Sequence, residues 1–232
     1  MEEIAQSSKR KTQNICMLTA YDYPMAKILD EAGVDIVLVG DSLGNVVLGY
    51  KSTRSVTLED MLHHTGAVAR GVKCALVVAD IPFKALSLKN AKKLIKAGAQ
   101  AVKIEGVKGI KEIKKIIKAK IPVMGHIGHL PQTMPKAKIH SDKALIKQAK
   151  DLEKAGVFAL VLEMVDKDLA KEITASIKIP TIGIGSGFAC NGQVLVTYDL
   201  IGLSDWSPKF APKFVDLKTI IKGAVKKFIE RP

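Results

Sequence analysis

The chain has 232 residues, of which 47% are hydrophobic and 25% charged, with a formal net charge of +13 at pH 7. This length suits one α/β barrel or two small domains, and no Pro/Ser-rich linker divides the sequence. No apolar run approaches the ~20 residues that a membrane-spanning helix needs. The polar segment 1–12 also lacks the apolar core of a signal peptide. We therefore predict a cytoplasmic protein with no membrane partner, formed by a single barrel domain over residues 1–232.

The positive charge is spread over many predicted helices and does not form one stripe. Aromatic residues make up only 5% of the chain, so few side chains are available to stack on bases. These two features argue against a nucleic-acid partner, and the alternative of a basic nucleic-acid-binding protein predicts a salt-sensitive affinity for DNA. A general positive field would instead favour anionic small substrates. The dispersed lysines include Lys92, Lys93, Lys96, Lys111, Lys114, Lys115, Lys118, Lys147, Lys150, Lys154, Lys222, Lys226 and Lys227.

The three cysteines stand far apart in the sequence. Cys16 and Cys74 have apolar, strand-like surroundings and are predicted to be buried reduced thiols. Cys190 falls in a predicted loop and is expected to be more exposed, with a nucleophilic role as the alternative. Neither a zinc-binding spacing nor a base next to Cys190 is present in the sequence.

Eight short β-branched runs are predicted as strands, and helical patterns lie between most of them. The seventh run is followed only by the loop 185–193, so one helix is short or missing. The helix beginning near residue 58 opens with a capping-box variant, Thr57 to Asp60. Strands are expected at 15–19, 35–40, 74–79, 101–104, 122–125, 158–162, 181–184 and 194–197, and helices at 23–32, 58–70, 88–97, 110–117, 141–152, 169–177 and 217–228.

This alternation predicts a (β/α)8 TIM-type barrel. A doubly wound open sheet is the alternative, but it would usually carry a glycine-rich turn after the first strand. Here that turn, residues 20–23, contains no glycine, and the glycine-rich segment 183–187 closes a late strand without a helix behind it. The match to a dinucleotide-binding motif is therefore weak.

The same sequence pattern occurs three times in the chain: a predicted helix ends in Ala-Gly, an apolar strand follows, and an acidic residue comes at the end of that strand. Each glycine suits the left-handed position that ends a helix. Each strand is apolar enough to be buried on both faces, as parallel strands are. The copies run from 31–33 to Asp41, from 96–98 to Glu105 and from 154–156 to Glu163.

Acidic residues end three consecutive predicted strands at Asp41, Asp80 and Glu105. The carboxyl ends of the strands in a parallel barrel meet at one rim, where the active site is built. Clustered carboxylates repel one another and need a cation, and an all-oxygen ligand set favours Mg²⁺. The alternative is that each acid caps the following helix, although Asp41 and Asp80 stand well before the next predicted helix.

Three further polar residues belong to the same predicted rim. Lys103 stands two residues before Glu105 on the same face of the strand, so the two side chains are expected to point in the same direction at the rim. His126 leaves the rim of the fifth strand, either as a substrate contact or bonded to a backbone group. Glu163 ends the sixth strand across the barrel and is the candidate general base, with a lysine-paired rim acid as the alternative.

Nine short segments resemble, in the same order, those of the ketopantoate hydroxymethyltransferase (3-methyl-2-oxobutanoate hydroxymethyltransferase) family. Several short motifs in one order are far more specific than any single motif. The segments are LTAYDY (18–23), VGDSLG (39–44), ADIPF (79–83), VKIEG (102–106), GHIG (125–128), PQ (131–132), VLE (161–163), IGIG (182–185) and GQVLV (192–196).

The resemblance implies a TIM-type barrel of the phosphoenolpyruvate/pyruvate superfamily, assembled as a homo-oligomer, commonly a decamer. It implies an enzyme of pantothenate and coenzyme A biosynthesis. Such an enzyme transfers a hydroxymethyl group from 5,10-methylenetetrahydrofolate to 3-methyl-2-oxobutanoate, through a Mg²⁺-stabilised enolate, and gives 2-dehydropantoate.

The motifs also imply roles for particular residues. Asp41, Asp80 and Glu105 would hold Mg²⁺. Ser42 and Lys103, together with Asp41 and Asp80, would bind the keto acid, and His126 is a further expected substrate contact. Glu163 would accept the proton.

The chain departs from the family pattern in places. The loop 133–140 is shorter than usual, Asn191 stands where relatives often have Asp, and Tyr198 stands where they often have His. These departures concern substrate closure, folate contacts and assembly. Two alternatives remain: a related Mg²⁺-dependent 2-oxo acid carbon–carbon lyase or aldolase without folate, and a catalytically silent barrel kept for assembly.

Overall fold

The computed structural model describes residues 15–134 and 136–231. The segment 1–12, on which the prediction of no signal peptide rests, lies outside the described residues. The chain divides into two compact units, one up to Val194 and the other from Leu195 onward. That residues 1–232 form a single domain stays a prediction. Among the described helices, none combines the length and apolar character needed to cross a membrane.

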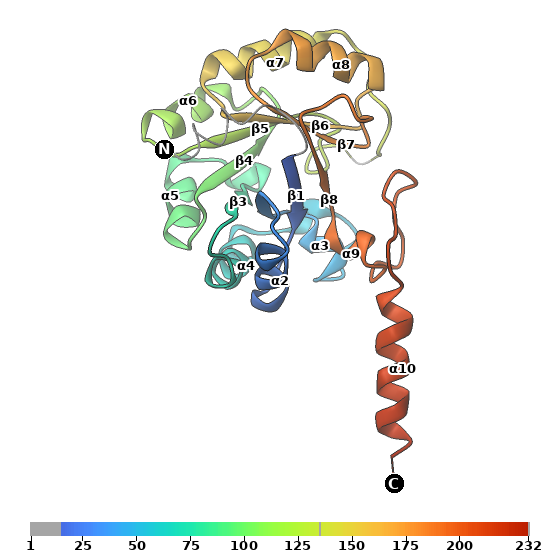
Figure 1. The fold of residues 1–232 in the computed structure, drawn as a ribbon. Helices are drawn as coiled ribbons and strands as arrows, with labels where there is room; N and C mark the ends of the chain where they lie inside the picture. The colour runs from blue at the N-terminus through green and yellow to red at the C-terminus, as the bar shows by residue number, and fades with distance from the viewer. Residues whose placement is uncertain (1–14, 135, 232) are drawn as a thin grey trace. The chain divides into compact units, whose positions relative to one another are not determined.

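Eight parallel strands close into a barrel in chain order, which confirms the predicted fold (Figure 1). Each predicted strand is present, with bounds that differ by three residues or fewer. The barrel closes where the backbone N–H of Ile15 donates to the carbonyl of Asn191, and a side chain at Gly192 would overlap the Ile15 backbone there. The strands are β1 (Ile15–Thr19), β2 (Ile36–Val39), β3 (Leu76–Asp80), β4 (Ala101–Glu105), β5 (Val123–Gly128), β6 (Ala159–Glu163), β7 (Thr181–Ile184) and β8 (Gly192–Leu195).

Helices surround the strands of the first unit (Figure 1). In the described residues no helix lies between β7 and β8, as the sequence predicted. There are also two short 3-10 helices. The first, η1 (Thr53–Ser55), lies between α3 and α4, and the second, η2 (Phe83–Ala85), lies between β3 and α5. The helices are α2 (Tyr23–Glu31), α3 (Leu43–Val46), α4 (Leu58–Gly71), α5 (Leu88–Lys96), α6 (Ile110–Lys118), α7 (Ala144–Ala155) and α8 (Lys167–Ser176).

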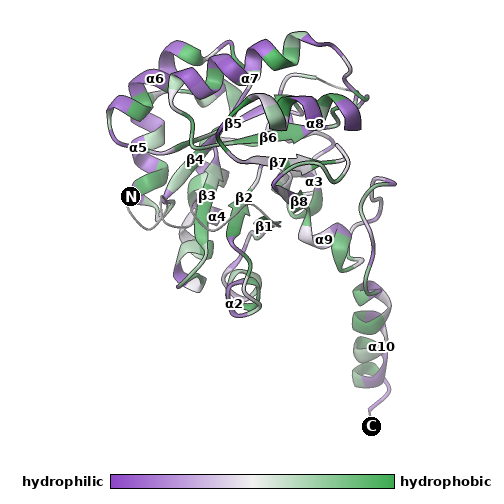
Figure 2. Cartoon of the chain, turned by 45° about the horizontal axis from the view of Figure 1, so that its top comes forward, coloured by the Kyte–Doolittle hydropathy of each residue, from purple (hydrophilic) through white to green (hydrophobic). Residues whose placement is uncertain are grey.

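The outer helices are amphipathic, with polar residues on their outer turns and apolar strands inside them (Figure 2). In α6, Ile113 and Ile116 are fully buried while the lysines of the same helix are not. The predicted capping box at the start of α4 is present, since the Thr57 and Asp60 side chains each bind the other's backbone N–H. The three repeated glycines, Gly33, Gly98 and Gly156, have φ of 84°, 114° and 96°, which confirms their predicted left-handed conformation.

The second unit contains α9 (Thr197–Leu200) and α10 (Leu217–Ile229). Asp216 caps α10 by accepting from the backbone N–H of Thr219. The Lys218 ammonium lies 2.6 Å from the Asp205 carboxylate, and the Phe214 N–H donates to the Leu200 carbonyl. These contacts tie α10 to the loop that precedes it.

Two predictions about burial and local structure are wrong. Cys16 and Cys74 are exposed and Cys190 is partly buried, because Cys16 lies on the face of β1 opposite buried Met17, while Cys74 precedes β3 in a bend. The short helix α3 also begins two residues after Asp41, closer than predicted. Its N-cap residue, Ser42, makes no side-chain capping bond.

Candidate functional site

The barrel interior is apolar toward the amino ends of the strands and polar at the rim formed by their carboxyl ends. Buried residues Val78, Ala101, Met124 and Val161 belong to the apolar cluster. Two residues further along each strand come polar side chains, because successive residues alternate between the faces of a strand. The polar residues that follow the cluster in this way are Asp80, Lys103, His126 and Glu163, with Glu105 one further step along β4.

Three acids at or just after the ends of consecutive strands are buried close together. Asp41, Asp80 and Glu105 are 7%, 1% and 6% exposed, and the Asp41 backbone N–H donates to Asp80 Oδ2 at 3.0 Å. Burial, reinforced by the Asp80 charge, raises the pKa of Asp41 to about 7. Burial also raises the pKa of Glu105 to about 9. The cluster therefore resists holding three negative charges unless positive charge is supplied.

Lys103 supplies one positive charge to this cluster. Its Nζ lies 2.8 Å from Asp80 Oδ1, and both side chains are buried. Burial alone lowers the pKa of Lys103, but the carboxylates of Asp80, Asp41 and Glu105 raise it by more. Lys103 is therefore protonated at neutral pH and is a fixed cation inside the rim.

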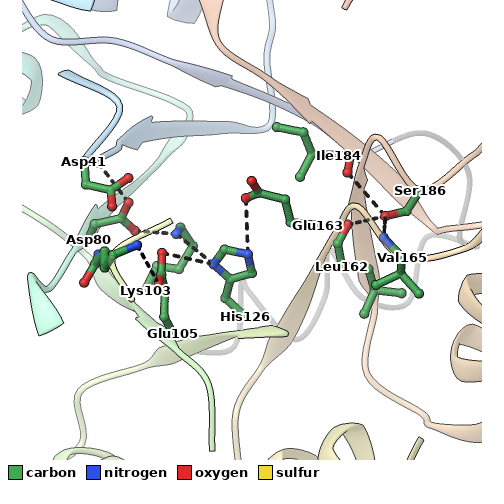
Figure 3. Close-up of polar contacts among 11 residues, drawn as sticks. Asp41, Asp80, Lys103, Glu105, His126, Leu162, Glu163, Val165, Ile184 and Ser186 are labelled. Carbon is green, nitrogen blue, oxygen red and sulfur yellow. Dashed lines mark hydrogen bonds and ion pairs between the residues drawn. The ribbon is translucent and has the colours of Figure 1, made fainter. Parts of the chain in front are cut away.

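His126 lies between this cluster and Glu163 (Figure 3). The Lys103 ammonium can only donate, so His126 Nδ1, 3.5 Å away, accepts. Burial, together with the charge of Lys103, lowers the pKa of His126 well below its ordinary value. The neutral ring then carries its proton on Nε2, which lies 3.3 Å from Glu163 Oε2. The histidine thus lies beside the candidate base, but its Nε2 makes no hydrogen bond with the described residues.

Glu163 differs from the other three acids in its environment. Its side chain keeps 19% exposure, so a substrate can reach it. Burial nevertheless raises its pKa to about 7, against the opposing effect of Lys103. A carboxylate with a pKa near neutrality is a stronger base than an ordinary glutamate and is still ionised in a large fraction of molecules.

The acidic cluster has the chemistry of a cation site. Asp41 Oδ2 and Glu105 Oε1 are buried and receive no hydrogen bond from the described residues. Within residues 15–134 and 136–231, no three acidic, histidine or cysteine side chains have the arrangement of a ready-formed metal site. In the structure, the Asp80 carboxylate is paired with the Lys103 ammonium. The all-oxygen donor set fits a hard divalent cation, and the assignment of these residues as metal ligands stays a prediction.

Several residues at the rim were not assigned roles from the sequence. The Tyr21 and Ser42 hydroxyls lie 2.8 Å apart, so Tyr21 orients a predicted substrate contact. The Gln132 N–H donates to Glu105 Oε2 at 3.2 Å. His129 and His140 stack with ring centroids 6.2 Å apart, and the His129 backbone N–H donates to the Glu163 carbonyl at 2.8 Å. Tyr21 and Gln132 fall within the family motifs quoted above, the one signal that points to them.

The fold and the rim together define a parallel (β/α)8-barrel protein with an acidic site at the carboxyl ends of its strands. The family profile described as ketopantoate hydroxymethyltransferase matches residues 1–231. The chain belongs to this enzyme family, which confirms the resemblance found in its motifs.

Named relatives agree with that assignment. The chain is 50% identical to the 3-methyl-2-oxobutanoate hydroxymethyltransferase of Caldicellulosiruptor bescii, over 96% of this chain and 90% of that protein. It is 52% identical to the protein of the same name from Acetivibrio thermocellus, over 96% and 85%.

Among solved structures, 2,3-dimethylmalate lyase of the PEP mutase/isocitrate lyase superfamily aligns with a TM-score of 0.71 at 16% identity, over 97% of this chain and 86% of that one. A phosphonopyruvate hydrolase complex with oxalate and Mg²⁺ aligns with a TM-score of 0.65 at 14% identity, over 97% and 84%. At these identities the likeness concerns the fold.

Proposed function

We propose that this protein transfers a hydroxymethyl group from 5,10-methylenetetrahydrofolate to 3-methyl-2-oxobutanoate, giving 2-dehydropantoate for pantothenate biosynthesis. Family membership supports the reaction. Among the residues, the observation that supports this reaction best is the different environment of one acid among four. Three are buried around Lys103, and the fourth, Glu163, is reachable by a substrate and separated from them by His126.

In this proposal Asp41, Asp80 and Glu105 hold Mg²⁺. Bound Mg²⁺ would polarise the keto group of the substrate and stabilise the negative charge that develops as a proton is lost. The buried oxygens of Asp41 and Glu105 that receive no hydrogen bond from the described residues support this role.

The keto acid is bound by side chains that face the same cluster. The Lys103 ammonium neutralises the substrate carboxylate at close range. The Ser42 hydroxyl, oriented by Tyr21, donates a hydrogen bond to it. Asp41 and Asp80 complete the contacts, and His126 lines the side toward Glu163. Together these groups hold the carbon that will react within reach of the base.

Glu163 acts as the general base in this mechanism. Its carboxylate takes the proton from C3 of the keto acid, and the neutral His126 ring lies beside that carboxylate, with Nε2 3.3 Å from Glu163 Oε2. A positioned general base typically contributes ~10²–10⁴ in rate. The one-carbon unit is bonded to two nitrogens of the donor. The electron pair left on C3 forms a bond to that unit as one C–N bond breaks, and water supplies the hydroxyl group as the other C–N bond breaks. The proton held by Glu163 and the second proton of water go to the two nitrogens. Alignment of C3 with the donor carbon supplies much of the remaining acceleration.

The cellular setting is part of the same proposal. We place the enzyme in the cytoplasm and expect a homo-oligomer, a decamer being common in the family. No nucleic-acid or membrane partner is proposed, since the dispersed lysines favour small anionic substrates.

A label-transfer experiment tests the proposed reaction. The protein is incubated with Mg²⁺, 3-methyl-2-oxobutanoate and methylenetetrahydrofolate labelled in its one-carbon unit. We expect the label in 2-dehydropantoate and Mg²⁺-dependent loss of the C3 proton. Loss of the proton without transfer would instead indicate a related 2-oxo acid lyase or aldolase. If the protein catalyses neither proton loss nor label transfer, the result would indicate a catalytically silent barrel.

A further inference from the structure

The turn between β1 and α2 carries Tyr21, whose hydroxyl lies 2.8 Å from the Ser42 hydroxyl at the rim. Just before the turn, the Ala20 N–H donates to the Leu38 carbonyl of β2. Helix α2 begins just after it, at residue 23. Tyr21 therefore belongs to neither regular element, and the place of its ring depends on the contacts that the turn makes.

Helix α4 supports this turn at two points. His64, which is partly buried on α4, places its Nδ1 2.6 Å from the carbonyl oxygen of Tyr21. At the end of α4, a Cβ on Gly71 would lie 2.6 Å from the carbonyl oxygen of Tyr23, so the two backbones approach closely there. Helices α2 and α4 also pack side by side (Figure 1). The turn is thus held against α4 at residue 21 as well as at residue 23.

The chemistry of the His64 contact decides which atom donates. A carbonyl oxygen only accepts, so the hydrogen is on His64 Nδ1. A neutral ring then has its lone pair on Nε2, whereas a protonated ring carries a hydrogen on each nitrogen. The bond to Tyr21 forms in both cases, so this contact holds the turn whatever the charge of the ring.

The position of Tyr21 matters for the direction of the Ser42 hydroxyl. That hydroxyl has one hydrogen, and in the proposed function it goes to the carboxylate of the keto acid. The bond between the two side chains must then be donated by the Tyr21 hydroxyl to Ser42 Oγ. Tyr21 is 1% exposed, so its ring is held by its surroundings. Three donated bonds thus lead from His64 to Tyr21, from Tyr21 to Ser42, and from Ser42 to the substrate.

We propose that His64 is a positioning residue for keto-acid binding: its Nδ1–H holds the Tyr21 backbone, and through Tyr21 it directs the Ser42 hydroxyl toward the substrate carboxylate. The inference rests on the proposed function, because Ser42 is a substrate contact only there. It extends the site to α4, an outer helix, whereas the other groups of the site come from strand ends and the loops that follow them. His64 acts through Tyr21 and is not itself a catalytic residue.

Two substitutions at residue 64 separate the donated bond from the size of the side chain. Leucine and asparagine both branch at Cγ, but only asparagine carries an N–H near the place of the histidine Nδ1. For His64→Leu we expect the Kd of 3-methyl-2-oxobutanoate, measured by calorimetry with Mg²⁺, to rise about three- to tenfold, as for one lost hydrogen bond. His64→Asn should stay within about twofold of wild type. The exchange rate at saturating keto acid should fall less than twofold in both, because the lost contact is made equally to bound substrate and transition state.

A double-mutant cycle shows whether the effect passes through Tyr21. Tyr21→Phe removes the hydroxyl that faces Ser42 and should itself raise the Kd of the keto acid. In that background His64→Leu should add less than about twofold, since the hydroxyl that His64 positions is already gone. A general structural role for His64 would instead give the same rise in both backgrounds, and that result would contradict the inference.

His63→Leu is the matched control, since His63 is the neighbouring histidine and its side chain is exposed. It should leave the Kd unchanged. Circular dichroism checks that each variant is folded, and His64→Ala replaces His64→Leu if the latter is not. A Kd within twofold of wild type in the variant without the donor would overturn the inference, and so would an equal rise in His64→Asn.

Failure of the proposed function gives a different result. A wild-type protein that binds no keto acid would refute the proposed function and this inference with it. A protein that shows the expected Kd differences but transfers no label would refute the proposed transfer reaction alone, and the role of His64 in keto-acid binding would stand.

Discussion

Glu163 sets the pH dependence expected of the proton-removal step. Its pKa is raised by burial to about 7, and only the carboxylate form can accept a proton. A bound divalent cation favours that ionised form, so with Mg²⁺ the inflection should lie between the ordinary carboxyl value and about 7. Below it the exchange rate should fall about tenfold per pH unit, and above it the rate should level off.

Deuterium exchange at C3 of 3-methyl-2-oxobutanoate, followed by proton NMR at saturating Mg²⁺ and keto acid, measures this profile. An inflection above pH 8 would contradict the assignment. So would a rate that falls as the pH rises, since that is the behaviour of a group that must be protonated.

The sequence could predict the acids at the rim but not the residues that support them. Strand ends and the two-residue period place Asp80, Lys103 and Glu105 on one face. The contacts of Tyr21 with Ser42 and of Gln132 with Glu105 join residues that lie 21 and 27 positions apart in the sequence. No periodicity links such pairs, because they depend on how the closed barrel brings separate loops together.

Among the elements, the end of β5 fixes the position of Glu163. Gly128 has φ of 97°, and a Cβ there would overlap the carbonyl oxygen of Glu163 on β6. For Gly128→Ala we expect a loss of ~1–2 kcal/mol from the left-handed backbone alone, and slower proton exchange because β6 must shift.

Unfolding in urea measures the stability part of this prediction. Gly223→Ala is the control, because Gly223 is inside α10 and, its chain neighbours and helix backbone aside, no atom of the described residues lies within 4 Å of the place that an added methyl group would take. That change should be neutral or stabilising, by up to ~1 kcal/mol. Equal effects of the two substitutions would contradict the role given to Gly128.

Regular elements were predicted well because their signals are local. All eight strands follow from short β-branched runs, and the amphipathic stripe of α6 follows from its isoleucines. The four-residue helix α3 is too short to carry a periodic signal, so it was not foreseen. Helix α7 begins at Ala144 and not at residue 141, since boundaries are the part of an element that periodicity defines least.

For the molecule as a whole, the acidic cluster should link stability to divalent cations. A ligand that binds only the folded state stabilises it by ~2.7 kcal/mol at a concentration 100 times its Kd. We expect Mg²⁺ to raise the unfolding free energy of the wild-type protein in this way. Glu105→Gln should lose most of the gain, because it removes one proposed ligand.

Glu59→Gln is the matched control, since Glu59 is exposed on α4 and should leave the Mg²⁺ effect intact. Urea unfolding with and without Mg²⁺ measures all three proteins. An undiminished gain in Glu105→Gln would show that the cation binds elsewhere.

Removal of the C3 proton by Glu163, from a keto acid held by the cluster around Lys103, is the step on which the proposed function depends. Its most direct test is the rate of deuterium exchange into 3-methyl-2-oxobutanoate, with Mg²⁺, by wild-type protein and by Glu163→Gln. We expect the variant to bind Mg²⁺ and keto acid as before but to exchange at least ~10² times more slowly. Exchange by Glu163→Gln at the wild-type rate would show that another group removes the proton.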